Sequence, residues 1–177
     1  SSDVCSSDLF APPTLSTGGS TTASATASAG SHSVNVQSLA KAERKLTAGF
    51  ATTTTTLNNG EAFNLNLSIH GGANQSISVA TGKDTPSGIV AAINEANLGV
   101  KAQLVNTGEA GAPYKIMVTG QTGALNDFVL SAEAVAPATT LSAETSILFD
   151  TTLQNAANGM VTVDGMSLTP SSNQLTD

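Results

Sequence analysis

Apolar and polar residues alternate through the middle of the chain, between Gly60 and Thr119. A period of two places the apolar side chains on one face of a strand and the polar side chains on the other. We therefore expect strands near 62–69, 77–79, 100–104 and 114–118, with a turn at Gly71-Gly72 between the first two, and a further short strand near 128–132. The alternating apolar positions are Phe63, Leu65, Leu67, Ile69, Ile77, Val79, Val100, Ala102, Leu104, Tyr114, Ile116 and Val118.

One segment of this region has a helical pattern instead. Apolar residues recur from Ile89 to Ala96 at a spacing that lines one side of a helix. Thr85 is a suitable N-cap, and Pro86 suits the first turn. Gly99 stands where a left-handed residue closes many helices. These features predict one amphipathic helix at about 85–98.

The predicted elements outside this region are short. Residues 33–38 favour a strand, and 39–46 are compatible with either a short helix or a bent continuation of that strand. The five threonines at 52–56 favour extended backbone, because branching at Cβ restricts the side chain. Leu153–Ala157 indicates a brief helix, and Asp164-Gly165 between two alternating runs predicts a hairpin. The fold class is therefore α+β and β-rich, with small antiparallel or mixed sheets and one main helix.

The order of these elements suggests a discontinuous domain with an insertion. We expect 30–58 and 150–177 to form one β domain by pairing in one sheet, because each alone is too small to bury a face. Residues 59–135 would form an inserted β-β-α-β-β domain. The small, turn-rich segments at 10–29 and 136–149 are expected to be linkers, the first of them disordered or loosely held.

The first nine residues, SSDVCSSDL, resemble one reading frame of a sequencing adapter. We interpret 1–9 as an artefact, the alternative being a native tail with a free thiol at Cys5. Without Asp3 and Asp8 the formal charge changes from −7 to −5, so the chain remains acidic. We expect the natural sequence to continue at both ends.

Charge and composition limit the classes of partner. A nucleic-acid surface needs clustered basic residues, and only Lys41, Arg44 and Lys45 lie close together, which is typical of a solvated face. No apolar run reaches the ~20 residues of a membrane span. Aromatic residues make up 3% and charged residues 11% of the chain, which is typical of secreted β-rich proteins.

The residues that commonly carry chemistry are isolated from one another in the sequence. Neither His32 nor His70 has a His, Cys or carboxylate at metal-ligand spacing, and His70 suits a turn. No nucleophile elbow, phosphate-binding loop or calcium loop occurs. We predict that the chain is not an enzyme and has no catalytic, metal or cofactor residue. The carboxylates considered were Asp84, Glu95, Asp127, Asp150 and Asp164, most of which suit caps and turns.

Three segments, in order, resemble the family of flagellar filament-capping proteins, also called hook-associated protein 2. Residues 60–120 are similar to the flagellin IN motif through FNLNLSI, the Ile93-Asn94 pair of the helix, VKAQLVN and YKIMVTG. Two flanking matches extend the resemblance over about 24–177. They are carried by Gly30, Val34, Val36, Leu39 and Ala40 upstream, and by Thr162, Val163, Asp164, Gly165, Ser172, Asn173 and Asp177 downstream.

This resemblance implies a structural protein of the bacterial flagellum, secreted to the distal tip of the filament. Such proteins form a cap, usually a homopentamer, that promotes flagellin polymerisation and prevents loss of subunits. The coiled-coil terminal helices of the family are not in this chain. A surface adhesin for host mucin or another glycan remains an alternative, as does another flagellar protein with an IN motif, such as flagellin. Neither a cofactor, a nucleic acid nor a membrane is implied as a partner.

Overall fold

The computed structural model describes residues 31–135, 140–141 and 149–175, together with short strands at 5–6, 14–17 and 21–24. Contacts divide the chain into two compact units. Unit 1 comprises Ser1–Ala42, Thr122–Leu125 and Ala156–Asp177, and unit 2 comprises Glu43–Gln121 and Asn126–Asn155. The chain therefore passes from one unit to the other four times, after residues 42, 121, 125 and 155.

The domain boundaries expected from the sequence stay a prediction. Within the expected linker at 10–29, the described backbone forms β2 (Thr14–Thr17) and β3 (Thr21–Ser24), which pair in antiparallel fashion. Within 136–149, Phe149 is buried in the hydrophobic core. Most of 1–9, the rest of 10–29, 136–139 and 142–148 lie outside the described residues.

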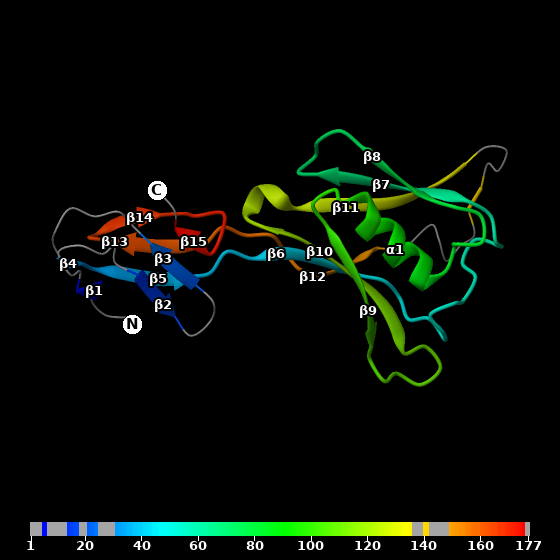
Figure 1. Cartoon of the computed structure of the whole chain (residues 1–177), viewed down its shortest axis with the longest axis horizontal. Coiled ribbons are helices and arrows are strands. Elements are labelled where there is room, and N and C mark those ends of the chain that lie inside the picture. The colour runs from blue at the N-terminus through cyan, green and yellow to red at the C-terminus, as the bar shows by residue number, and fades with distance from the viewer. Residues whose placement is uncertain are drawn as a thin grey trace. The chain divides into compact units, whose positions relative to one another are not determined.

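Unit 2 contains two antiparallel sheets (Figure 1). In the first, β7 (Phe63–Ile69) lies between β8 (Gln75–Val79) and β11 (Phe128–Ala134). The second has the order β12 (Thr151–Gln154), β6 (Ala42–Leu46), β10 (Tyr114–Thr122) and β9 (Lys101–Asn106). The strands predicted from alternation are all present, and the α+β, β-rich fold class is confirmed.

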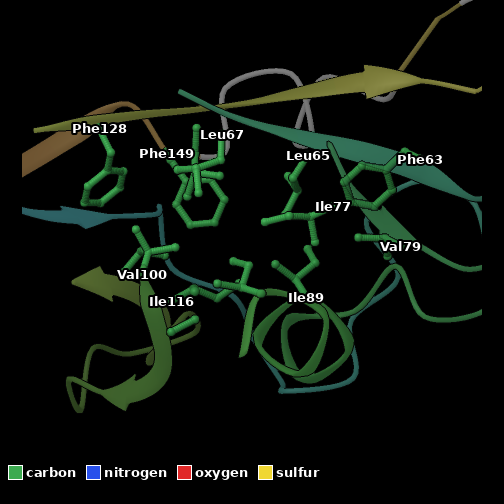
Figure 2. Close-up of a cluster of buried hydrophobic side chains, with 14 of the residues drawn as sticks. Phe63, Leu65, Leu67, Ile77, Val79, Ile89, Val100, Ile116, Phe128 and Phe149 are labelled. Atoms are coloured by element: carbon green, nitrogen blue, oxygen red, sulfur yellow. The ribbon is translucent and has the colours of Figure 1, made fainter. Parts of the chain in front are cut away.

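The helix α1 (Pro86–Ala96) packs its apolar side on the inward face of the first sheet. Figure 2 shows Ile89 pointing from the helix toward Ile77 and Val79, in a core that also contains Phe63 and Phe128. Each such side chain contributes about 1.5–3 kcal/mol when it is fully buried. In the first sheet, the alternation therefore specifies which face of each strand points into this core.

The two ends of α1 show one prediction confirmed and one corrected. Thr85 is the N-cap, and its Oγ1 accepts a hydrogen bond from the Gly88 backbone N–H at 3.0 Å. The helix ends at Ala96, and Asn97 takes the left-handed conformation with φ 50°. The closing role assigned to Gly99 was therefore wrong, although Gly99 also has a positive φ of 90° in the loop that follows.

Unit 1 contains the predicted hairpin. The strands β13 (Met160–Val163) and β14 (Met166–Leu168) pair through a turn in which Asp164 and Gly165 both have positive φ, as a type I′ turn requires. On its other edge β13 pairs with β5 (Val34–Ser38). Two further pairings are the parallel contact of β15 (Gln174–Leu175) with β3 and the antiparallel contact of β1 (Cys5–Ser6) with β4 (Ser31–His32).

The structure decides three local expectations. Residues 42–46 are strand β6, so the bent-strand alternative for 39–46 is the correct one. The helix at Leu153–Ala157 was wrong, because 151–154 pair with β6 as strand β12. The extended backbone at 52–56 was also wrong. Hydroxyl groups bond locally there, with Thr52 Oγ1 and Thr55 Oγ1 3.0 Å apart, and this bonding stabilises bends and a turn instead.

The early and late segments do pair, but not in one sheet. Strand β5 pairs with β13 in unit 1, whereas β6 pairs with β12 in unit 2. The pairing expected from burial alone was correct, and the single sheet was not.

In the described ranges, no helix combines the length and the apolar character of a membrane-spanning segment.

Candidate functional site

The polar contacts of the described residues show whether catalytic or metal-binding geometry is present. Among the described residues, no group of three or more His, Cys, Asp or Glu side chains could hold a metal ion. Of the carboxylates considered from the sequence, Asp84 is buried, whereas Glu95 and Asp150 are exposed. Asp127 and Asp164 each meet a histidine, which the sequence did not predict.

In unit 1, the contact of His32 with Asp164 joins β4 to the β13–β14 turn. The two side chains lie 2.5 Å apart, from His32 Nδ1 to Asp164 Oδ2. Asp164 Oδ1 also accepts a hydrogen bond from the Ser33 backbone N–H at 2.8 Å, and the Asp164 N–H donates to the Ser33 carbonyl. The hydrogen bond from His32 and, next, that from Ser33 lower the pKa of the Asp164 carboxyl below its ordinary 3.8.

In unit 2, His70 and Asp127 form a second pair of the same kind. The distance from His70 Nδ1 to Asp127 Oδ1 is 2.5 Å, and the His70 N–H donates to the Asp127 carbonyl at 2.7 Å. These residues directly continue the ladder in which Ile69 opposes Phe128. His70 has a φ of 48°, so it forms the expected turn after β7, and its bonds to Asp127 also hold the start of β11.

Two carboxylates are buried in unit 2, and each accepts at least one hydrogen bond from a backbone N–H. Asp84 Oδ2 accepts hydrogen bonds from the N–H groups of Asn58 at 2.7 Å and Gly60 at 2.8 Å. Glu43 Oε2 accepts one from the Phe128 N–H at 2.5 Å. A buried polar group costs free energy unless it is hydrogen-bonded, and these bonds meet that requirement. Both carboxylates therefore have a structural explanation.

The Ile93-Asn94 pair of the IN-like segment joins α1 to the second sheet. Ile93 is fully buried in the core. The Asn94 side-chain amide donates to the Ala102 carbonyl at 2.9 Å, and its Oδ1 accepts from the Ala102 N–H at 2.8 Å. One residue thus supplies apolar packing, and the next satisfies both backbone groups of a residue in β9. The sequence resemblance pointed to this pair but not to its hydrogen bonds.

Four large apolar side chains are exposed in the described part of unit 1: Leu125 at 66%, and Met160, Met166 and Leu168 on the β13–β14 hairpin. In the strand register, Val161 opposes Leu168 and Val163 opposes Met166, so these four share a face. Val161 is 2% exposed, whereas Met166 is 65% and Leu168 is 41% exposed. The apolar side chains of this face are thus shielded from solvent on β13, as Val161 shows, and exposed to solvent on β14. Such an open apolar edge is typical of a protein contact surface.

Comparisons with solved structures give one consistent result. The chain aligns with the D2–D3 domains of the flagellar cap protein FliD from Escherichia coli with a TM-score of 0.71 and 26% identity, covering 99% of this chain and 87% of that one. The chain has the fold of flagellar cap protein D2–D3 domains.

Two further cap-protein structures support this assignment. The D1–D2–D3 structure from Escherichia coli gives a TM-score of 0.72 at 26% identity over 94% of this chain. FliD from Pseudomonas aeruginosa gives a TM-score of 0.66 at 24% identity over 86% of this chain. At this level of identity the similarity shows a shared fold alone. The chain spans about half (50%) of that D1–D2–D3 structure. No family model and no curated protein sequence matches the chain.

Proposed function

We propose that this chain is part of a flagellar filament cap, which promotes flagellin polymerisation at the growing tip and prevents leakage of subunits. The similarity to the cap protein D2–D3 domains over 99% of the chain, with a TM-score of 0.71, is the observation that carries the proposal. The order of the capping-family motifs along the chain agrees with it.

The finer parts of the proposal concern place and assembly. We expect the protein to be secreted, to reside at the distal tip of the filament and to form a homo-oligomer, as a pentamer. The exposed Met166 and Leu168 of the hairpin supply apolar surface for contacts between protein molecules. The solved neighbours are described as cap proteins, so we propose a structural role and not catalysis.

The alternatives have less support. An adhesin that binds mucin or another glycan would be expected to present exposed aromatic side chains, and no phenylalanine or tyrosine is among the large exposed apolar residues of the described part. Flagellin or another protein with an IN motif would share the central segment of the sequence. The reported structural neighbours, however, are cap proteins over more than four fifths of this chain.

A domain exchange would test the proposal. The D2–D3 region of the Escherichia coli cap protein is replaced with this chain, and the chimera is expressed in a strain that lacks its own cap protein. Controls are the native cap protein and a version without D2–D3. We expect the chimera to restore filament growth and to reduce the flagellin lost to the medium. Losses as high as those of the version without D2–D3 would refute the proposed role.

A further inference from the structure

We propose that a groove between β8 and α1 in unit 2 binds an extended segment of a partner polypeptide, which adds to β8 as an antiparallel strand. This inference goes beyond the proposed role in a cap and does not depend on it. The open edge of β8, the small residues on the facing side of α1 and the two opposite charges along the groove together support it.

Strand β8 is an edge strand without the usual protection. It is last in the order β11-β7-β8, and β7 is its one partner among the described strands. Edge strands normally carry a charge, a proline or a bulge that blocks pairing with another chain. The sequence of β8 is QSISV, and its register with β7 is continuous. At the opposite edge of the same sheet, β11 carries Glu133, which accepts a hydrogen bond from Asn66.

The groove beside this edge has a size suited to a short peptide. Its volume is about 680 Å³, within the range of ~300–1,000 Å³ that binding sites commonly occupy. On the strand side the groove is lined by Ser78 and Val79 at the end of β8 and by Ala80 just after it, so the earlier part of the β8 edge continues beyond the groove. The helix side is lined by small residues and one acid, namely Ser87, Gly88, Ala91, Ala92 and Glu95. Large side chains at these helix positions would fill the space where an added strand would lie.

Two opposite charges mark the direction of the groove. Lys83 lies in the turn after β8, and Glu95 lies in the last turn of α1, which runs back along β8. Neither forms an ion pair within the described ranges. The donors at the start of α1 are already used, because the Ser87 N–H donates to the Thr53 carbonyl and the Gly88 N–H to Thr85. The Lys83 ammonium is thus the group that would attract an anion at this end.

These features define the chemistry of the bound segment. An antiparallel segment begins beside Lys83 and ends beside Glu95, so it carries an acidic residue first and a basic residue last. Between them, the residues that face the groove are small, and the alternate residues are free to be larger. Five residues of β8 offer about 17 Å of edge at ~3.4 Å per residue, so a segment of similar length would cover it.

Binding of defined peptides tests the proposal. The probe is a fluorescent heptapeptide with blocked ends and the sequence DVSVSVK, in which the charged ends and both serines share the face toward the groove. The second peptide, KVSVSVD, exchanges the two charged ends. Anisotropy titrations use the whole 177-residue chain. We expect saturable binding of the first peptide and about fivefold weaker binding of the second, because the exchange replaces two exposed ion pairs with like-charge contacts. The double variant Lys83→Glu with Glu95→Lys should invert this preference.

A filled groove is the matched structural control. Ala91→Phe places a large side chain at an exposed helix position that lines the groove, and we expect it to weaken binding at least tenfold. Gln103→Phe adds the same side chain at an exposed position of β9 outside the groove and should leave binding unchanged. Thermal unfolding of both variants shows whether the fold is kept.

Three results would overturn the proposal. The first is no saturable binding of either peptide at millimolar concentration. The second is equal binding of the two peptides, or a preference for the second. The third is dimerisation of the chain that Ala91→Phe abolishes while neither peptide binds, because the occupant would then be a second copy of this chain and not a partner segment.

Discussion

Replacing Asn94 with alanine should loosen the contact between α1 and β9. Asn94→Ala removes both hydrogen bonds to the backbone of Ala102, a residue that is only 7% exposed. In the β9–β10 ladder Ala102 opposes Val118, but its N–H and carbonyl are bonded to Asn94. After the substitution, no side chain replaces these two bonds.

The expected loss of stability follows from this geometry. Two hydrogen bonds contribute about 0.5–1.5 kcal/mol each, and a buried group left without a partner costs about 1–3 kcal/mol. Alanine is the better helix former by about 0.5 kcal/mol, which offsets part of the loss. We therefore expect a net destabilisation of about 2–3 kcal/mol. For a chain of this size, that corresponds to a decrease in Tm of about 4–12 °C.

Thermal unfolding followed by circular dichroism measures this change. The control is Glu95→Ala, the exposed neighbour on the same helix, which should stay within about 0.5 kcal/mol of the original protein. Hydrogen exchange should show reduced protection of the Ala102 amide in Asn94→Ala alone. An unchanged Tm with full protection at Ala102 would show that the hydrogen bonds of Asn94 do not stabilise the contact between α1 and β9.

Three other substitutions test separate contacts. Asp84→Ala should cost about 2–4 kcal/mol, measured by urea unfolding, because it leaves the buried Asn58 N–H and the half-buried Gly60 N–H without their acceptor. A cost below about 1 kcal/mol would contradict this explanation. For Asp164, the folded-state pKa is lowered, so its stabilisation is present above about pH 3.8 and is lost as the pH falls through the lower folded value. Asp164→Asn keeps a residue suited to the turn and should make Tm depend less on pH below 5. If the dependence of Tm on acidic pH is unchanged, the contact of Asp164 with His32 is not the source of that dependence. Gly88→Ala should destabilise the chain although alanine normally favours helices, because a Cβ there would lie 2.0 Å from the Lys83 carbonyl oxygen; a rise in Tm would refute this.

Local patterns predicted the parts of the fold that depend on neighbouring residues. The hairpin at Asp164-Gly165 follows from two residues that accept positive φ, and α1 follows from a cap and an apolar stripe. The strand faces follow from alternation, as Phe63 and Leu65 show by their complete burial. Each of these signals lies within about ten residues of sequence.

Contacts between distant residues were not predictable in the same way. Asp164 meets His32 across 132 positions, and Asp127 meets His70 across 57, so no spacing rule could have joined them. The segment at 151–154 has a weak pattern of its own and becomes a strand because β6 offers an edge to pair with. At 52–56, local hydroxyl bonding outweighed the β propensity of threonine. Tertiary partners therefore determine the His–Asp contacts and the strand at 151–154, whereas local side-chain hydrogen bonds determine the conformation at 52–56.

The four passages of the chain between its two units set the order in which they can be completed during synthesis. Every residue of unit 2 has left the ribosome once position 155 has emerged, whereas unit 1 still lacks 156–177. Strand β5 is made early but must wait for β13, more than 120 positions later, before it can pair. Unit 2 should therefore complete its fold first, and unit 1 should follow when β13 becomes available to pair with β5.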